Sequence, residues 1–310
     1  MKFNLKQIEA FVWVTDLGSF RKAADRLNTT QPNISSRISQ LEKALNVVLM
    51  ERDAGSVRLT AKGRDLLTCA RQVLKSVDDL VEATNENALL DGVLRLGVTE
   101  MIVHTWQREY LLELKNRFPN VVVEVTVDLS ANLENELFDR SIDLALQSGP
   151  FNRQSSGSKA LGVYPLIWIA SPSIELYRQK KIRIEELVQY PVLTHARGTQ
   201  PYREVAAHFA ARRDLKVRLV PSSNLAACIQ MAVDGFGTAT VPGAMVSQEL
   251  KSGALVKLNY GWTPKSLSFF ARYDAEKSAQ FVEHAATIAT EISSNYLNPS
   301  PKKPGKKESL

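Results

Sequence analysis

The chain has 310 residues, of which 44% are hydrophobic and 23% charged, and its formal net charge at pH 7 is +6. This composition is typical of a globular protein, excludes a disordered or fibrous chain, and at this length allows two or three domains. The sequence has no run of about 18 apolar residues, which excludes a membrane-spanning helix. Its polar first residues argue against a secretion signal, so we expect a cytoplasmic protein.

The cysteines and histidines predict neither disulfides nor a metal site. Cys69 and Cys228 are the only cysteines, they lie far apart in the sequence, and both are expected to be buried small side chains. None of the four histidines has the HExxH spacing of a zinc site or a similar one. We therefore expect no metal and no cofactor.

The positive charge is concentrated in the first segment. Residues 1–64 contain eleven Lys or Arg and six Asp or Glu, a net charge of +5, whereas residues 65–91 have a net charge of −4. A local positive charge is typical of a surface that binds phosphates. Ordinary surface charge explains an excess of this size equally well.

Two short helices are predicted at the start of the chain. Apolar residues from Leu5 to Leu27 follow helical spacing, interrupted once at 16–19, where Gly18 suits a helix end and Ser19 an N-cap. A third helix is expected to begin after Thr30, with Pro32 in its first turn, where the missing N–H costs no hydrogen bond.

The third helix has an apolar and a polar face. The apolar positions are Ile34, Ile38, Leu41, Leu45 and Val48, and the polar positions are Asn33, Ser35, Ser36, Arg37 and Gln40. A polar face is usually only solvated, but this helix follows another helix after a short turn. That is the helix-turn-helix arrangement, which places the second helix in the major groove of DNA.

A hairpin and a long helix are predicted next. Turn residues 53–56 separate two short strands at 49–52 and 57–60, with Arg52 and Arg58 at the sides of the hairpin. From Gly63 to residue 91, apolar side chains recur with a period of about 3.5 residues, which predicts a helix that pairs with another helix. Packing against its own domain is the alternative.

After Gly92 the pattern alternates between strands and helices, which predicts parallel α/β sheets built from two successive sets of elements. The first set has strands at 93–99, 121–127 and 143–147 and helices at 103–118 and 133–140. The second has strands at 162–170, 217–220 and 238–241, a segment at 184–193, and helices at 202–212 and 225–234. Late strands at 255–258 and 267–273 precede a helix at 278–295, and residues 297–310 are expected to be a disordered basic tail.

A dense motif runs through the first helices and the hairpin. It is Ala23-Ala24-x-x-Leu27-x-x-x-Gln31-Pro32-x-x-Ser35-x-x-Ile38-x-x-Leu41-Glu42-x-x-Leu45, followed by Leu49-x-x-Arg52 and Leu59-Thr60-x-x-Gly63. This motif resembles the N-terminal signature of LysR-type transcriptional regulators. Downstream, Ile142-Asp143-Leu144-Ala145 and residues 232–242 resemble the effector domain of the same family, so the likeness extends from residue 3 to about residue 290.

The resemblance implies a fold and a domain organisation. Residues 1–62 would form a winged helix-turn-helix DNA-binding domain, all-α with a small β wing, and residues 63–91 a dimerising linker helix. Residues 92–296 would form an α/β effector-binding domain similar to periplasmic solute-binding proteins. Its first subdomain would comprise about 92–161 with 267–296, and its second about 162–266.

The resemblance also implies a function. Members of the family are sequence-specific regulators, typically dimers of dimers, that bend promoter DNA under the control of a small metabolite. The implied partners are double-stranded promoter DNA, a small-molecule effector, further copies of the chain and RNA polymerase, with no membrane partner.

Eight residues are expected to bind DNA. Gln31 can pair with an adenine edge and Pro32 can touch a thymine methyl group. Ser36 stands where the family often has Arg, so Arg37 either takes over part of that contact or is simply solvated. Arg52, Arg58 and Thr60 are expected to hold the DNA backbone. The full set is Gln31, Pro32, Ser35, Ser36, Arg37, Arg52, Arg58 and Thr60.

The effector is expected between the two subdomains, beyond the carboxyl ends of the strands. Hydroxyls and helix N-terminal N–H groups favour a carboxylate, to which His195 or Arg197 would add positive charge. Thr99, Ser130 and Thr199 match positions that commonly line the pocket of the family. The full set is Thr99, Met101, Ser130, His195, Arg197, Thr199, Gln200 and Asn224. Loop capping, solvation and, for Met101, a place in the core are the alternatives.

No catalytic motif is present in the sequence. There is no GxSxG elbow, P-loop or GxGxxG after a strand, and Gly235-Phe236-Gly237 lacks the third glycine and predicts a turn. We therefore expect a binding protein and no enzyme. The alternative function is a cytosolic small-molecule-binding α/β protein whose N-terminal region only dimerises or binds DNA without sequence preference.

Overall fold

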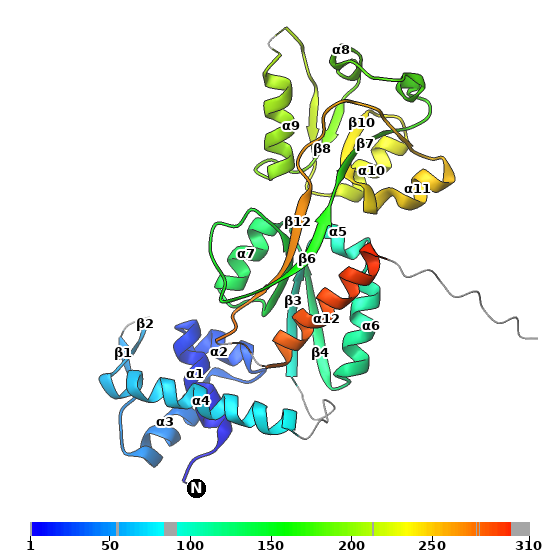
Figure 1. Cartoon of the computed structure of the whole chain (residues 1–310). Coiled ribbons are helices and arrows are strands. Elements are labelled where there is room, and N and C mark those ends of the chain that lie inside the picture. The colour runs from blue at the N-terminus through cyan, green and yellow to red at the C-terminus, as the bar shows by residue number, and fades with distance from the viewer. Residues whose placement is uncertain are drawn as a thin grey trace, which may run out of the picture.

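The computed structural model describes residues 2–53, 56–83, 92–212, 214–276, 278 and 280–298. Residues 2–83 form a mainly helical unit, called here the head, which lies at one end of an elongated molecule (Figure 1). Two α/β units, the first and second subdomains, follow in a row. Among the described residues, no helix is long and apolar enough to cross a membrane.

Three helices form the core of the head: α1 (Leu5–Leu17), α2 (Phe20–Arg26) and α3 (Gln31–Leu45). Each follows a polar N-cap whose side chain accepts a hydrogen bond from a backbone N–H, and these caps are Asn4, Ser19 and Thr30. Gly18 ends α1 with φ +62°, a conformation that glycine adopts without strain. The three predicted helices and the caps predicted at Ser19 and Thr30 are confirmed.

The wing of the head is a two-stranded hairpin. Strands β1 (Met50–Asp53) and β2 (Ser56–Leu59) pair antiparallel, with Met50 opposite Leu59. The long helix α4 (Ala61–Ala83) begins directly afterwards. A Cβ atom on Gly63 would lie 2.1 Å from the carbonyl oxygen of Leu49, so only glycine allows α4 to approach β1 this closely.

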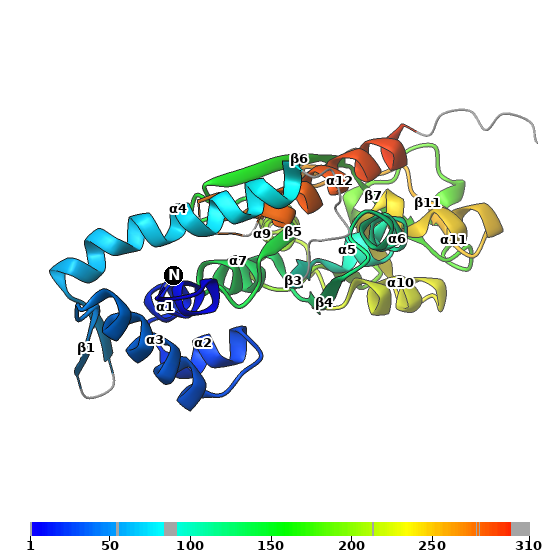
Figure 2. The same ribbon diagram turned by 90° about the horizontal axis from the view of Figure 1, so that it is seen from below.

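Helix α4 leads from the wing to the start of the last helix of the chain, along one side of the head (Figure 2). Leu66, Leu67, Ala70 and Leu74 are partly buried and pack against the core of the head. At heptad spacing from Leu66, however, Val73 and Leu80 remain 42% and 69% exposed. The helix therefore packs on its own domain and also presents exposed apolar side chains. The predicted continuation to residue 91 lies outside the described residues.

The first subdomain is built on a five-stranded sheet with strand order β4-β3-β5-β12-β6. Its strands are β3 (Gly92–Val98), β4 (Val121–Val127), β5 (Leu144–Ser148), β6 (Gly157–Tyr164) and β12 (Leu267–Tyr273). Helices α5 (Glu100–Val103), α6 (Gln107–Arg117) and α12 (Gln280–Leu297) lie on one face, and α7 (Ser130–Phe138) lies on the other (Figure 1). Leu144 and Leu146 face the α6 and α12 side, whereas Ala145 packs with α7.

The second subdomain has a five-stranded sheet with strand order β11-β7-β10-β8-β9. Its strands are β7 (Leu166–Ala170), β8 (Val192–Thr194), β9 (Leu219–Pro221), β10 (Thr238–Pro242) and β11 (Val256–Lys257). Its helices are η2 (Glu175–Arg178), α8 (Ile184–Leu187), α9 (Gln200–Ala210), α10 (Leu225–Val233), η3 (Gly243–Val246) and α11 (Ser247–Ser252). Helix α9 packs on the face of Trp168, and α10 packs on the opposite face, that of Ile169.

The fold class is confirmed, but three details of the α/β region were predicted wrongly. The strand expected at 162–170 is divided at Pro165, because β6 pairs with β12 and β7 pairs with β10 in the other sheet. The helix expected at 103–118 is interrupted, with α5 ending at Val103 and α6 beginning at Gln107. Both sheets are mixed rather than parallel, since β12 and β7 run antiparallel to their neighbours.

Two single-residue expectations are also wrong. Cys69 is exposed on α4 and only Cys228 is buried. Leu297, expected in the tail, ends α12 and packs against the hydrophobic core of the subdomains. The remainder of the predicted tail, from residue 299 on, lies outside the described residues.

Candidate DNA-binding surface and effector site

Helix α3 presents its polar face to solvent because its apolar face anchors it in the head. Ile34, Ile38 and Leu41 are buried against the core. The predicted DNA-binding residues of α3 occupy the remaining surface: Gln31, Pro32 and Ser36 are exposed, and Ser35 and Arg37 are half-buried. The structure therefore places these five residues along one helix, beginning at its first turn.

Local hydrogen bonds order this surface. The hydroxyl of Ser36 accepts a hydrogen bond from the Gln40 amide at 3.1 Å, and Gln7 of α1 donates to the Oε1 atom of Gln40 at 2.8 Å. The Asn33 amide donates to the hydroxyl of Thr29 at 2.8 Å. Side chains that are already oriented in this way lose less conformational entropy when they contact a base edge.

The three residues expected to hold the DNA backbone differ in their placement. Arg58 is exposed on β2, and the strand register pairs it with Glu51, whereas the backbone of Arg52 pairs with that of Val57. The side chain of Arg52 lies outside the described residues. Thr60 is already engaged, because its hydroxyl donates to the carbonyl oxygen of Val48 at 2.7 Å and accepts from Gly63 N–H at 2.9 Å. Thr60 thus joins the wing to α4.

In the first subdomain, the predicted effector residues follow neighbouring strands. Thr99 follows β3 and Ser130 begins α7, shortly after β4. Ser148 ends β5, and its backbone N–H donates to the hydroxyl of Ser130 at 3.1 Å. Because β4, β3 and β5 are adjacent and parallel, their carboxyl ends meet at one edge of the sheet. The Oγ1 atom of Thr99 is buried there, without a hydrogen-bond partner among the described residues.

In the second subdomain, two of the five predicted effector residues act as helix caps. Thr199 caps α9 and donates to the carbonyl oxygen of Ala196 at 2.7 Å, and Asn224 caps α10 by accepting from Ala227 N–H at 2.7 Å. Gln200 donates to Glu204 at 2.8 Å. Arg197 is exposed, with its Cζ atom 5.8 Å from the centre of the Tyr202 ring. These groups lie after β8 and β9, at the carboxyl edge of the second sheet.

One residue that the sequence analysis missed joins the two edges. The carboxylate of Glu100, at the start of α5, accepts hydrogen bonds from the backbone N–H groups of Leu225 and Ala226 at 2.6 and 2.8 Å. These are the first residues of α10, where the helix dipole favours negative charge. In the sequence, the only sign of this role is that Glu100 is an acidic residue in the first turn of a helix, which is a weak signal. The structure shows it as a bridge between the subdomains.

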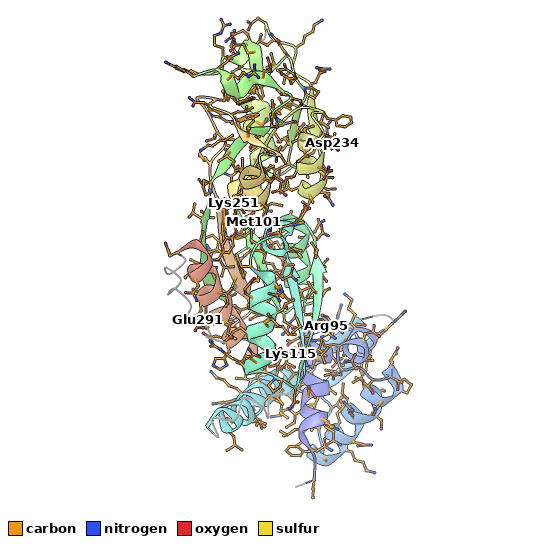
Figure 3. The ribbon with its side chains drawn as sticks, turned by 90° about the vertical axis from the view of Figure 1, so that its right-hand side faces the viewer. Arg95, Met101, Lys115, Asp234, Lys251 and Glu291 are labelled. Carbon is orange, nitrogen blue, oxygen red and sulfur yellow. The ribbon has the colours of Figure 1, made fainter. Side chains whose placement is uncertain are left out.

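Two predicted effector residues are buried. Met101 packs in the hydrophobic core close to the junction of the subdomains (Figure 3). A place in the core is the alternative considered for Met101 from the sequence. His195 is enclosed beside β10, and burial lowers the pKa of its imidazole to about 4 despite a hydrogen bond to the backbone of Thr240. The ring is therefore neutral at pH 7. The expectation that His195 adds positive charge to the site is wrong.

Comparison with known proteins identifies the two parts of the chain. Residues 5–64 match the family described as "Bacterial regulatory helix-turn-helix protein, lysR family", and residues 87–287 match "LysR substrate binding domain". The HTH-type transcriptional regulator CzcR of Bacillus cereus is 28% identical over 255 residues, covering 81% of this chain and 84% of that protein.

Solved structures share the fold along nearly the whole chain. The crystal structure of ArgP from Mycobacterium tuberculosis aligns with a TM-score of 0.62 and 20% identity over 93% of this chain and 96% of that one. Full-length CbnR, crystallised with its target DNA, aligns with a TM-score of 0.51 and 18% identity over 94% of this chain and 100% of that one. With both family matches in the expected order, this chain belongs to the LysR-type family of transcriptional regulators.

Proposed function

We propose that the chain recognises a promoter through the exposed face of α3 and responds to a small carboxylate bound where the carboxyl edges of the two sheets meet. The main support for base recognition is the placement of Gln31, Pro32 and Ser36, which are exposed at the start of a helix whose other face is buried. A Gln amide matches the donor and acceptor pattern of adenine, and a proline ring can contact a thymine methyl group. Arg58 on the wing would contact phosphate.

The DNA contacts can be tested with a duplex selected from a random library by the purified protein, compared with a scrambled duplex. Gln31→Ala should cost about 1–3 kcal/mol on the selected duplex and nothing on the scrambled one. Arg58→Ala should weaken both alike and reduce the dependence of affinity on salt, because it removes a phosphate contact. Gel shifts at several salt concentrations measure both effects.

Two outcomes would contradict this assignment. Equal losses on both duplexes for Gln31→Ala would remove the base contact. Failure of the wild-type protein to select any sequence would favour the alternative of a small-molecule-binding protein that holds DNA without sequence preference. Arg212→Gln in the second subdomain is a matched control, because it removes an exposed ion-paired arginine far along the chain from the head.

The proposed effector site combines hydroxyls with helix N-termini. Ser130 lies in the first turn of α7, Thr199 caps α9, and Thr99 contributes a buried hydroxyl that is still unsatisfied among the described residues. The N-terminus of α10 already carries the carboxylate of Glu100. A carboxylate effector would therefore bind at α7 and α9, or would replace Glu100 at α10 and separate the subdomains.

A thermal-shift series can test the effector proposal, with acetate, succinate, citrate and benzoate as probes. At least one acid should raise the melting temperature of the wild type, and Ser130→Ala should reduce that shift. Glu100→Gln should increase the shift if the ligand replaces Glu100, because the amide binds the α10 N-terminus more weakly than a carboxylate does. The absence of any shift in both the wild type and Glu100→Gln would contradict a carboxylate effector.

We further propose that the chain self-associates, as a dimer of dimers, and contacts RNA polymerase while it regulates as a binding protein without catalytic activity. Support for self-association comes from exposed apolar side chains in two places. Val73 and Leu80 lie on α4, and Val103, Leu112, Val122 and Val127 lie on α5, α6 and β4. Exposed apolar side chains in such groups favour contact with another protein surface. Sedimentation measurements of the oligomeric state of Leu80→Glu and of Leu112→Glu would show which step of self-association depends on each group.

A further inference from the structure

The head packs against residues 139–143 of the first subdomain, called here the α7–β5 corner, which belongs to neither candidate site. Asp16, near the end of α1, is paired with Arg71 of α4 and with Arg140 of the corner. Arg26, at the end of α2, is paired with Asp143 of the corner. Two ion pairs thus join the head to the subdomain. In one the head supplies the acid, and in the other it supplies the base.

These ion pairs are shielded from water. The side chains of Asp16 and Asp143 are only 3% and 8% exposed, and those of Arg26 and Arg140 are 11% and 13% exposed. A buried charge without a partner is strongly unfavourable, so Arg140 depends on the acid, and Asp143 on the base, that the head supplies. Each acid is also held by its own domain, because Asp16 pairs with Arg71 and Asp143 accepts from Arg95 N–H at 2.9 Å.

An aromatic ring adds to the contact. The Cζ atoms of Arg26 and Arg140 lie 4.4 and 4.6 Å from the centre of the Trp13 ring, within the range of cation–π attraction. One guanidinium group comes from the head and the other from the corner. Arg95, which lies at the end of the first subdomain that faces the head (Figure 3), donates to the carbonyl oxygen of Arg26 at 3.3 Å. Charge, stacking and backbone hydrogen bonding therefore meet at one place.

The contact leaves the DNA-binding surface open. It uses α1, α2 and α4 of the head, whereas Gln31, Pro32 and Ser36 of α3 remain exposed. On the other side, the corner directly follows α7, which begins at Ser130. One short helix thus has a proposed effector residue at its start and the contact with the head just beyond its end.

We propose that these residues form an intramolecular latch that holds the head in one orientation on the first subdomain. In this orientation α3 is presented to DNA at a set angle. In a dimer, the latch would therefore set the direction in which each of the two α3 helices points. A shift of α7 on effector binding would act on Arg140 and Asp143 first. The latch itself requires neither DNA nor effector, so it can be tested separately from the proposed function.

The test is an intramolecular distance measured by pulsed electron spin resonance. Spin labels are attached at Lys22→Cys on α2 and Ser294→Cys on α12, both exposed, in a Cys69→Ser background, and labelled chains are diluted with unlabelled ones. Arg140→Asn removes the guanidinium group at a residue with φ +60°, where Asn is well tolerated. Arg26→Gln breaks the second ion pair from the head side. Arg212→Gln is the control, because its ion pairs lie within the second subdomain.

A single narrow distance distribution is expected for the wild type and for Arg212→Gln. Arg140→Asn and Arg26→Gln should each broaden or shift it, while binding to a duplex with one recognition site stays unchanged, since the α3 surface is intact. Distributions for both variants that match the wild type would overturn the latch. A loss of single-site binding that accompanies the broadening would also overturn it, because the residues would then maintain the fold of the head rather than its orientation.

Discussion

The DNA-binding surface and the proposed effector site are built in opposite ways. On α3, the relevant side chains lie on one face of a single helix, and their hydrogen bonds connect them to α1 and to the preceding turn. At the effector site, the groups come from the ends of strands in two sheets, and three of them, Thr199, Asn224 and Glu100, already cap a helix or bridge the subdomains. The first surface is therefore ready for a rigid partner. The second must exchange existing hydrogen bonds for those to a ligand.

The two regions also differ in what stabilises them. The core of the head is almost entirely apolar, with Gln7 as a buried polar side chain among the residues described there. The shielded carboxylate of Asp16 lies outside this core, at the contact with the first subdomain. The first subdomain instead encloses an ion pair between Arg272 and Glu134, which are 3% and 4% exposed. Glu134 also accepts hydrogen bonds from Asn152 and Arg153 N–H, and these bonds together with the guanidinium of Arg272 keep the pKa of Glu134 below its ordinary value against the opposing effect of burial. Loss of a single buried charge should therefore lower the stability of the effector region more than that of the core of the head.

The largest effect is expected at this buried pair. Arg272→Met leaves the Glu134 carboxylate buried without its partner and removes the stacking of the guanidinium on Phe151 at 3.9 Å. The free energy of unfolding of the effector region should fall by about 3–5 kcal/mol, measured by urea denaturation. Arg212→Met, which removes exposed ion pairs, should lower the free energy of unfolding far less, because water and salt screen exposed pairs. Similar losses for the two variants would show that the buried pair contributes no more to stability than an exposed one.

A second test uses the pH dependence of stability. Burial lowers the pKa of His195 to about 4 in the folded state, below the ordinary value of 6.5. As the pH falls from about 6.5 towards 4, the unfolded chain binds a proton that the folded chain does not, so the free energy of unfolding decreases, by about 3 kcal/mol in total. His195→Gln should flatten this slope in denaturation curves. An unchanged slope in His195→Gln would show that the ring is not protected from water.

The smallest effect concerns the head. Gly63→Ala places a Cβ atom 2.1 Å from a backbone oxygen of Leu49, and overpacking of this kind costs about 1–3 kcal/mol. The loss should appear in the unfolding transition of the head and leave that of the effector region in place. Gly18→Asn is the matched control, because its φ of +62° suits Asn and a Cβ atom there meets nothing within 4 Å. If Gly63→Ala and Gly18→Asn lowered the free energy of unfolding by the same amount, the close approach of α4 to β1 would not be the cause of the loss in Gly63→Ala.

Much of the head could be predicted because its signals are local. Ser19 and Thr30 cap their helices as expected, and the apolar spacing of Ile34, Ile38 and Leu41 correctly orients α3. In the α/β region, the strands at 121–127 and 267–273 were predicted with their correct bounds. Their partners and directions were not, because an alternating apolar pattern says which residues face a core but not which strand lies alongside.

The sequence alone determined the order of the helices and strands, the apolar and polar faces of α3, and the motif that places the chain in its family, since each depends on residues within a few turns of one another. Only the tertiary structure decided that Glu100 meets α10, that His195 is buried and neutral, and that Asp16 and Arg26 find partners at Arg140 and Asp143. Such pairs are separated by more than a hundred residues, or depend on burial by other elements. The free energy of a buried charge is set by its surroundings in space, which neighbours in the chain do not reveal.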